Sequence, residues 1–320
     1  MSLYSKYVIN AKFSDIDSRR DIVLDKLPVI SSNMTTVTGL SMAIAMNESN
    51  AYSCMHRFYP TTRDQVLDYI AVPTKASTFA SFGLGDVGRD QIQQLADAGC
   101  RNFCLDVAHG AQKQVAQQVN WFRSQLGAEP ILMVGNFGNS DSLLEFYQHL
   151  DTPKSIDYIK VGIGAGSVCR TTTKTGVGQD PVSAIQSISS LGRRYGFKVV
   201  ADGGIKTPGD VCIALAAGAS LVMLGSLLAG TTEVPGQSSI ELDGTVYKTY
   251  KGSASQESYI EQGKLADWRT DEGISSKVIW KGNVKDVLKD IEGSLRSSMS
   301  YVGARNIREY HEKATLSLLP

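Results

Sequence analysis

The sequence predicts an α/β protein of the (β/α)8 TIM-barrel class, in which eight parallel strands alternate with helices. Eight short apolar runs are bounded by Gly, Pro or Asn, and most gaps between them hold a helical pattern of apolar residues. Successive runs begin 23 to 29 residues apart, except for a gap of 41 residues after the sixth. This repetition favours a closed parallel barrel. An open doubly wound sheet is the alternative, but its usual G-x-G-x-x-G is missing after the first strand.

The expected barrel strands are apolar runs of the kind that is buried on both faces of a parallel sheet. They cover Leu27–Met34, Ala51–Arg57, Ser77–Gly83, Arg101–His109, Pro130–Gly138, Asp157–Gly164, Lys198–Ile205 and Leu221–Gly230. Apolar residues at helical spacing predict helices in the gaps, for example over Asp90–Ala98, Asp141–His149 and Pro208–Ala217. The first and third of these patterns end in Ala-Gly, and glycine there favours the turn that terminates a helix.

The 90 residues after the eighth strand are more than a closing helix needs. Ile240–Tyr250 alternates around an Asp-Gly pair and predicts a β-hairpin. The polar stretch Ser253–Ser276 predicts a mobile flap over the site, with a disordered loop as the alternative. Val284–Arg296 and Arg305–Ala314 are expected to be helices. We therefore expect one barrel domain over residues 1–320, with hairpin and flap at about 238–276 and closing helices at about 284–316.

Charge and cysteine content argue against several classes of protein. Lys and Arg together number 32, as do Asp and Glu, so the zero net charge gives no electrostatic case for a nucleic acid polymer or a membrane surface as partner. The first residues lack the apolar run of a signal peptide and no segment is apolar enough to span a membrane, so we expect a cytoplasmic protein. The five cysteines lack metal-type spacing and are expected to be reduced thiols.

A glycine-rich loop that contains Cys169 follows the sixth strand, inside the gap of 41 residues. Active sites of such barrels lie at the carboxyl ends of the strands, and this loop lacks the apolar periodicity expected around a core cysteine. Cys169 is therefore a candidate nucleophile, with an inert thiol as the alternative. Main-chain groups at Gly164, Gly166 and Cys169 are candidates to bind a monovalent cation such as K+.

Glycines also mark the ends of the seventh and eighth strands, as Asp202-Gly203-Gly204 and Gly225-Ser226. Exposed N–H groups at these two places form the usual phosphate site of a barrel, although tight turns alone would also require glycine. The carboxylate of Asp202 is a candidate acceptor for ribose hydroxyls. Together with the cysteine, these residues suggest a phosphorylated nucleotide that is attacked at its base.

These motifs resemble the IMP dehydrogenase and GMP reductase family, and are most like the bacterial-type GMP reductases. The resemblance extends from about residue 18 to 305 and rests on LPVISSNMTTV, MHRF, LDVAHG, KVGIGAGSVC, TGVG, VVADGGIKTPGDV, VMLGSLLAG, YKTYKGSAS and SSMSYVGA. The gap from Arg57 to Ser77 has no room for the regulatory modules that the dehydrogenases usually carry there. Ser253–Gly273 also lacks the Arg-Tyr pair with which the dehydrogenases activate water, so the resemblance favours a reductase.

The resemblance implies NADPH-dependent reductive deamination of GMP to IMP and ammonia through a covalent thioimidate on Cys169, with Thr171 and Glu272 moving protons as the amino group leaves. The GMP side would comprise Asp202, Gly203, Gly204, Gly225, Ser226, Gly252, Ser253, Ala254, Arg269 and Gly273. The NADPH side would comprise Ser18, Arg19, Arg57, Asp106, Val107, Ala108, Ser297 and Ser300. The resemblance also implies a homotetramer, in which a neighbouring subunit could supply part of the cofactor side.

Departures from the family pattern keep two alternatives open. Arg170 and Thr172 replace residues that are commonly apolar or basic in the family, and Thr231 stands where an imidazole is often found after the eighth strand. The usual opening motif is not recognisable in Met1–Asp17. The alternatives are an IMP dehydrogenase-like or altered-substrate purine nucleotide oxidoreductase, and a barrel that binds nucleotide without turnover.

Overall fold

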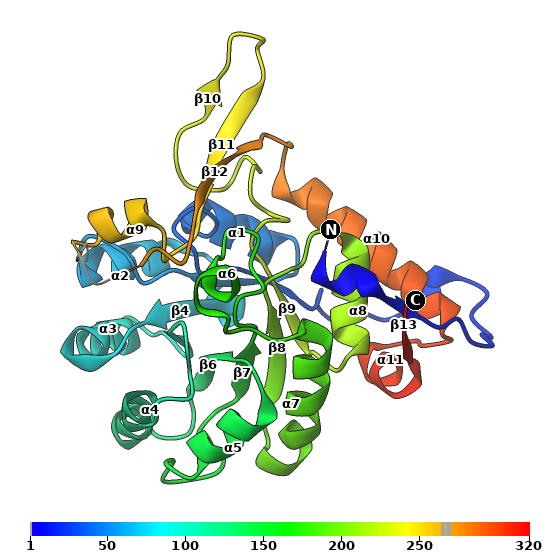
Figure 1. Ribbon diagram of the computed structural model, residues 1–320, viewed down its shortest axis with the longest axis horizontal. Helices are drawn as coiled ribbons and strands as arrows, with labels where there is room; N and C mark the ends of the chain where they lie inside the picture. Colours follow the sequence, from blue (N-terminus) through cyan, green and yellow to red (C-terminus); the bar gives the residue numbers. More distant parts are fainter. Residues whose placement is uncertain (1, 264–265, 267–269) are drawn as a thin grey trace.

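The computed structural model describes residues 2–263, 266 and 270–320 and has a closed barrel of eight parallel strands at its centre (Figure 1). The strands pair in chain order from β2 to β9, and the ring closes where Ile30 of β2 aligns with Met223 of β9. Their bounds are β2 Val29–Ser31, β3 Tyr52–Met55, β4 Thr78–Phe82, β5 Asn102–Asp106, β6 Ile131–Phe137, β7 Tyr158–Val161, β8 Lys198–Asp202 and β9 Leu221–Leu224. The predicted fold class is confirmed.

Helices surround this barrel, as Figure 1 shows. In chain order they are α1 Leu40–Glu48, α2 Thr62–Ala71, α3 Gly85–Asp97, α4 Lys113–Leu126, α5 Ser140–Tyr147, α7 Pro181–Tyr195, α8 Pro208–Ala216 and α10 Val284–Tyr301. α2 and α8 each begin with a capping box, formed by Thr61 with Asp64 and by Thr207 with Asp210. Each box satisfies two main-chain N–H groups at the start of its helix, which explains where these helices begin.

The buried interior has an inner and an outer part. Side chains that fill the inside of the barrel are Ile30, Cys54, Phe79, Cys104, Met133, Val200, Leu221 and Met223. Other strand residues pack outward against the helices, as in the group of Phe82, Phe103 and Phe122, whose ring centroids lie 5.2–6.3 Å apart. Because both faces of the strands are buried, they form the near-continuous apolar runs that made them predictable.

Some predicted strands extend too far at their carboxyl ends, and the eighth is the clearest case. β9 ends at Leu224, whereas the prediction continued to Gly230. Leu228 and Ala229 donate their N–H groups to the carbonyl of Gly225, so the chain turns there. Both residues are buried, which makes this turn look like a strand in the sequence. β5 likewise ends at Asp106, so Val107, Ala108 and His109 follow the strand.

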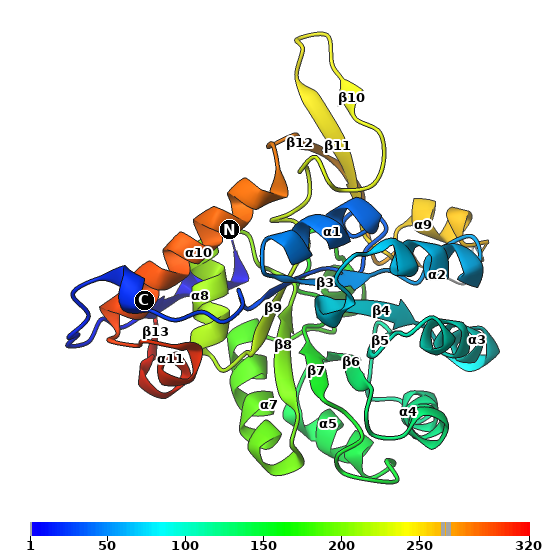
Figure 2. The same ribbon diagram turned by 180° about the vertical axis from the view of Figure 1, so that it is seen from behind.

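The predicted hairpin is present as β10 Ser239–Ile240 and β11 Val246–Lys251, and the stretch predicted as a flap contains regular structure, while its mobility stays a prediction. A third strand, β12 Ser275–Ile279, pairs with β11, and a short helix, α9 Gln256–Glu261, lies inside the stretch that was expected to form only a flap. The resulting sheet projects from the barrel (Figures 1 and 2). Because β12 is not covered by a core, its side chains alternate between exposed and half-buried and carry no apolar run.

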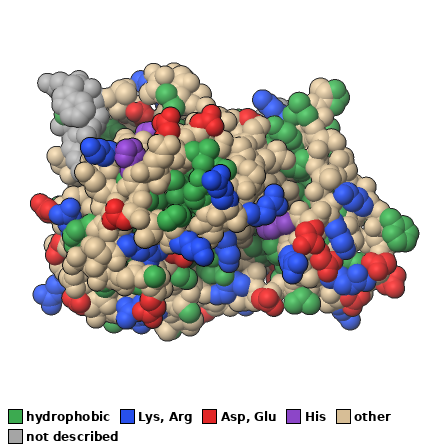
Figure 3. Space-filling model, turned by 90° about the horizontal axis from the view of Figure 1, so that it is seen from below, with side chains coloured by type: hydrophobic (Ala, Val, Ile, Leu, Met, Phe, Trp, Pro, Cys, Tyr) green, Lys and Arg blue, Asp and Glu red, His purple; other side chains and the backbone are tan. Residues whose placement is uncertain are grey.

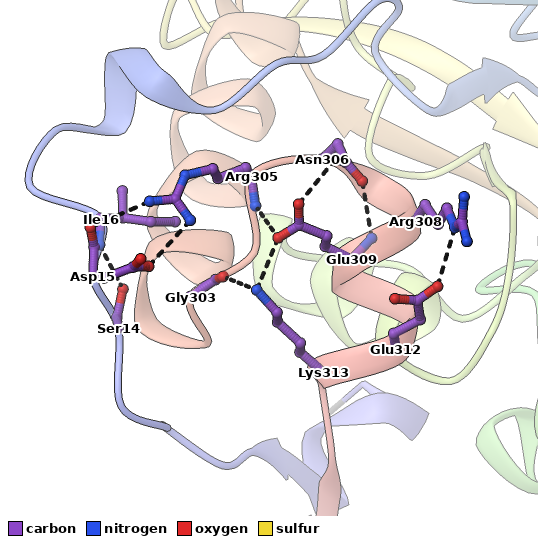
Figure 4. Close-up of polar contacts among 10 residues, drawn as sticks. All are labelled: Ser14, Asp15, Ile16, Gly303, Arg305, Asn306, Arg308, Glu309, Glu312 and Lys313. Carbon is purple, nitrogen blue, oxygen red and sulfur yellow. Dashed lines mark hydrogen bonds and ion pairs between the residues drawn. The ribbon is translucent and has the colours of Figure 1, made fainter.

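The two ends of the described chain form a small sheet that was not predicted. β1 Tyr7–Ile9 pairs antiparallel with β13 Leu316–Leu318, and each strand has only three residues, too few for a visible pattern. η1 Leu3–Lys6 precedes β1, and η2 Arg19–Asp21 follows it. Near β13, α11 Ile307–Lys313 follows α10, which is longer than expected because it continues to Tyr301. Arg305 also pairs with Asp15 at 3.1 Å (Figure 4).

The surface carries mixed charge. On the face seen in Figure 3, Lys and Arg side chains are interspersed with Asp and Glu side chains, as the balanced composition predicts. Among the described helices, none is both long and apolar enough to cross a membrane.

Candidate active site

Three residues predicted to be catalytic lie in one hydrogen-bonded row. The thiol of Cys169 donates to Oγ1 of Thr171 at 3.3 Å, and the Thr171 hydroxyl donates to Oε2 of Glu272 at 2.7 Å. Cys169 and Thr171 belong to the loop after β7, where Thr171 begins the short helix α6 Thr171–Thr175. Glu272 comes from the segment before β12, 101 residues further along the chain. The fold therefore connects the thiol to a carboxylate through one hydroxyl.

Main-chain contacts hold this row together. Cys169 forms an antiparallel β-bridge with Gly273, and the N–H of Arg170 donates to the carbonyl of Glu272 at 2.6 Å. A Cβ atom on Gly273 would lie 2.9 Å from the nitrogen of Ser255, and one on Gly252 would lie 2.9 Å from the carbonyl oxygen of Val168. Gly252 is therefore required by the close approach of the flap to the cysteine loop, and Gly273 by the close approach of two segments within the flap.

Of the other flap residues predicted to bind the nucleotide, the structure describes Ser253 and Ala254. Ala254 accepts the N–H of Glu272 at 3.1 Å, and Ser253 lies beside it on the same turn. Arg269 lies outside the described residues.

The predicted phosphate loops lie against each other at the carboxyl ends of β7, β8 and β9. The hydroxyl of Ser167 donates to the hydroxyl of Ser226 at 3.1 Å. Gly203 and Gly204 have φ angles of 89° and 80°, in the left-handed region that favours glycine. A Cβ atom on Gly203 would lie 3.1 Å from the nitrogen of Gly166. The loop after β8 thus approaches the cysteine loop as closely as its backbone allows.

The amino-terminal segment covers the outer side of the Gly203-Gly204 turn. The hydroxyl of Ser2 donates to the carbonyl of Gly204 at 3.0 Å, and Tyr4 is fully buried against the same glycine. Tyr7 donates to Asp180 at the start of α7 at 2.8 Å. The family's usual opening motif was not recognisable in the first 17 residues. The structure shows that Ser2 and Tyr4 of this segment border the Gly203-Gly204 turn.

A row of alternating charges crosses the mouth of the barrel. Arg57 faces Asp106 at 3.5 Å, and the ammonium group of Lys160 lies 3.4 Å from Asp106 and 3.1 Å from Asp202. Burial acts to raise the pKa of Asp106, but the charges of Lys160 and Arg57 outweigh it and the pKa is lowered. Burial acts to lower the pKa of Lys160, and the two carboxylates more than reverse this. Asp106 and Lys160 therefore stay charged near neutral pH.

Sequence reasoning missed three residues of this mouth, Lys160, Asn136 and Tyr250. The amide of Asn136 donates to Asp202 at 2.9 Å. Tyr250 is buried beside Gly225, where a Cβ atom would lie 2.8 Å from its hydroxyl oxygen. Burial, with Asp202 and Cys169 nearby, raises the pKa of Tyr250. Lys160 could have been found in the sequence, because it is a lysine within an apolar strand. A buried ammonium group requires charged or polar partners, so its position predicts such partners nearby.

The predicted cofactor residues lie in two places. Arg57 and Asp106 belong to the charged row, and Val107 and Ala108 follow Asp106 after β5. Ser18, Arg19, Ser297 and Ser300 lie instead on η2 and α10, outside the barrel strands. There, Arg19 and Ser297 line a shallow groove along α10. The structure does not bring these two groups into one cluster.

The candidate cation site consists of main-chain groups only. The carbonyl of Gly166 accepts the N–H of Cys169 at 3.0 Å. The hydroxyl of Thr172 donates to the carbonyl of Val177 at 2.9 Å and occupies the space where a Cβ atom on Gly164 would be. Cation binding at this loop stays a prediction. Within the described part of the chain, no group of three His, Cys, Asp or Glu side chains could hold a metal ion.

Comparison with known proteins finds relatives that match most of the chain. The family model described as "IMP dehydrogenase / GMP reductase domain" matches residues 14–319. GMP reductase 2 of Homo sapiens is 34% identical over 90% of this chain and 82% of its own length. GMP reductase of Bacillus subtilis is 34% identical over 88% of this chain and 82% of its own length.

Named dehydrogenases are similar to the chain as well. Inosine-5'-monophosphate dehydrogenase of Aquifex aeolicus is 38% identical over 73% of this chain, which spans only 48% of that protein. A crystal structure of inosine 5' monophosphate dehydrogenase from Legionella pneumophila superposes with a TM-score of 0.85, at 34% identity, over 99% of this chain and 98% of that one. The match along the chain and the shared fold show that this protein belongs to the IMP dehydrogenase / GMP reductase family of oxidoreductases.

Proposed function

We propose that this protein is a GMP reductase, which converts GMP and NADPH into IMP, ammonia and NADP+. The observation that supports this most is the row from Cys169 through Thr171 to Glu272. It connects a nucleophile to a carboxylate that can exchange protons, while the flap sequence contains no Arg-Tyr pair to activate water. A site with these groups is suited to expel an amine rather than to hydrolyse a covalent intermediate.

In this proposal the sulfur of Cys169 forms a bond to C2 of the guanine base. Protons pass from Glu272 and Thr171 to the 2-amino group, which leaves as ammonia when its bond to C2 breaks, and a thioimidate remains on Cys169. When bound, NADPH would supply the hydride that replaces the amino group at C2. The carbon–sulfur bond then breaks and the sulfur returns to Cys169. The balanced reaction consumes two protons and yields ammonium.

The nucleotide would bind over the loops of β7, β8 and β9. Asp202 would accept ribose hydroxyls, and the phosphate would meet the N–H groups of the two glycine turns. The residues proposed for this side are Asp202, Gly203, Gly204, Gly225, Ser226, Gly252, Ser253, Ala254, Arg269 and Gly273. Ser167 joins them because its hydroxyl contacts Ser226.

For the cofactor, Arg57 fits a phosphate or ribose partner, because its guanidinium is partly exposed at the mouth of the barrel and already fixed by Asp106. We propose that Ser18, Arg19, Ser297 and Ser300 contribute to the cofactor site of a neighbouring subunit in a homotetramer. This would account for their position on η2 and α10, outside the barrel strands.

An IMP dehydrogenase-like activity is the second candidate, because the named dehydrogenases match the chain at similar identity. One pair of assays separates the two. Purified protein is incubated with GMP and NADPH, and separately with IMP and NAD+, while cofactor absorbance and ammonia are measured. Loss of NADPH with equimolar ammonia supports the reductase, and formation of NADH from IMP contradicts it. Binding of GMP without change in either assay would indicate a barrel without turnover.

A further inference from the structure

Lys160 is a buried lysine that the proposed chemistry leaves without a role. It lies in the middle of β7, and its side chain is only 4% exposed. Its ammonium group contacts Asp202 at 3.1 Å and Asp106 at 3.4 Å, so it lies between a residue proposed for the nucleotide and one proposed for the cofactor. A buried ammonium is costly unless it is paired, which makes a position between two carboxylates informative.

The two carboxylate oxygens of Asp202 differ in their hydrogen bonds. Oδ2 receives hydrogen bonds from Lys160 at 3.1 Å and from the amide of Asn136 at 2.9 Å. Asn136 is itself fixed, because the same amide nitrogen donates to the carbonyl of Gly162 at 2.6 Å. Over residues 2–263, 266 and 270–320, no hydrogen bond reaches Oδ1 of Asp202. Lys160 and Asn136 therefore orient the carboxylate and leave one oxygen available to a ligand.

Lys160 also separates two negative charges. Both carboxylates lie within 3.5 Å of its ammonium group, and Arg57 pairs with Asp106 only. Without the lysine, two partly buried carboxylates would face each other across the mouth. Repulsion between them would turn Asp202 away from the orientation that Lys160 and Asn136 give it.

We infer that Lys160 is a positioning residue, which holds Asp202 turned so that its free oxygen accepts a hydrogen bond from the ribose of the nucleotide, and which links it to Asp106 on the cofactor side. The inference rests on the proposed nucleotide site. It predicts that Lys160 controls recognition of the ribose and not of the base or phosphate.

The test measures binding, so it does not require turnover. Dissociation constants of GMP and of 2′,3′-dideoxy-GMP are determined by calorimetry for the wild type, Lys160→Met and Lys160→Met/Asp106→Asn. Lys248→Met is the matched control, because Lys248 is also buried but donates to the carbonyls of Thr232, Val234 and Gly236 near the projecting sheet. Thermal unfolding of each variant shows that it is folded.

We expect the wild type to bind GMP at least about tenfold more tightly than the dideoxy nucleotide, as hydrogen bonds to a charged group do. In Lys160→Met this preference falls to within about threefold, while affinity for the dideoxy nucleotide is nearly unchanged. The double variant regains part of the preference, because Asp202 no longer faces a second negative charge. Lys248→Met keeps the wild-type preference.

A wild-type preference in Lys160→Met, or an equal loss of affinity for both nucleotides, would overturn this inference and leave the proposed function standing. A wild type that does not bind GMP would overturn both. If Lys160→Met does not fold, the double variant is compared with Asp106→Asn alone. A preference that is equal in these two proteins would also contradict the role of Lys160.

Discussion

At the scale of single residues, the surroundings of Cys169 differ from those of the other four cysteines. Cys54, Cys100, Cys104 and Cys212 are buried, and burial raises the pKa of Cys212 to about 11 and that of Cys100 to about 12. Such thiols stay protonated and unreactive. Cys169 is partly exposed and has a hydroxyl within hydrogen-bonding distance. Position in the fold, rather than residue type, therefore identifies the candidate nucleophile.

Replacement of this sulfur tests its role directly. We expect Cys169→Ala to abolish turnover of GMP with NADPH while its dissociation constant for GMP stays within about tenfold of the wild type, because the thiol acts after binding. Calorimetry and cofactor absorbance measure the two quantities. Cys212→Ala, which removes a buried thiol away from the loop, serves as the control. Substantial turnover by Cys169→Ala would rule out the covalent route.

The role of the Thr171 hydroxyl, which lies between the Cys169 sulfur and the Glu272 carboxylate, can be tested separately. Thr171→Val keeps the shape of the side chain but breaks the row, so we expect kcat to fall by about 100-fold to 10,000-fold, as for loss of a proton-transfer group. Thr171→Ser retains the hydroxyl and should keep most of the activity. The affinity for GMP should stay within a few-fold in both. If Thr171→Val matched Thr171→Ser in kcat, the hydroxyl would have no part in proton transfer.

The buried imidazole of His56 should make the free energy of unfolding depend on pH. Burial lowers the pKa of His56 from 6.5 to about 4, although Asp106 acts in the opposite direction. The unfolded chain therefore binds a proton before the folded protein does as pH falls. We expect the free energy of unfolding to decrease between about pH 6.5 and pH 4, by up to about 3 kcal/mol from this residue.

Thermal unfolding of the wild type and His56→Gln at pH 7 and pH 5 measures this contribution. The variant should be less stable at pH 7 because His56 stacks on Tyr59 and accepts the N–H of Phe58, but its stability should change less with pH. His149→Gln, at an exposed imidazole, should follow the wild type. Equal pH dependence in His56→Gln and the wild type would contradict the prediction.

At the scale of elements, the loops after the barrel strands depend on glycine for their geometry. Gly203→Ala would place a Cβ atom 3.1 Å from the nitrogen of Gly166 at a φ of 89°. We expect a loss of about 1 to 2 kcal/mol in the free energy of unfolding from the backbone conformation, together with weaker GMP binding because the loop moves. Gly244→Ala is the matched control, since its φ is 82° and the space around it is open.

Denaturant unfolding and calorimetry compare the two variants. Both should lose stability, but only Gly203→Ala should lose affinity for GMP. Unchanged GMP affinity in Gly203→Ala would show that the turn does not belong to the nucleotide site.

At the scale of the whole molecule, the two ends of the chain meet beside the barrel. β13 pairs with β1, Leu319 donates its N–H to the carbonyl of Lys6 at 2.7 Å, and η1 then leads to the Ser2 contact with Gly204. The segment from 303 to 313 adds further polar contacts, including Arg305 with Asp15 (Figure 4). The amino-terminal segment that covers the Gly203-Gly204 turn is thus connected to the carboxyl-terminal strand.

Deletion of residues 316–320 should release β1. We expect faster hydrogen exchange over residues 2–9, because the only strand that pairs with β1 in the described chain is removed, and a several-fold loss of GMP affinity as the cover of Gly204 loosens. Exchange measured by mass spectrometry and calorimetry provide the readouts. A protein that lacks Pro320 alone is the control. Unchanged exchange over residues 2–9 would contradict this coupling of the chain ends.

The sequence by itself determined the barrel and the candidate nucleophile. Buried parallel strands are continuous apolar runs, and glycine-rich loops interrupt them at the mouth, so both features are local and visible in the order of residues. Exposed or short elements such as β12, β1 and β13 carry no such pattern and were missed.

Only the tertiary structure decided which distant groups meet. Thr171 and Glu272 stand 101 residues apart, and Lys160 lies 54 residues from Asp106 and 42 from Asp202. A hydrogen bond or ion pair between such residues depends on the order of the strands and on the geometry of the loops. Both are set when the whole chain closes into the barrel. The thiol could therefore be found in the sequence, but its hydroxyl and carboxylate partners became a connected row only in the fold.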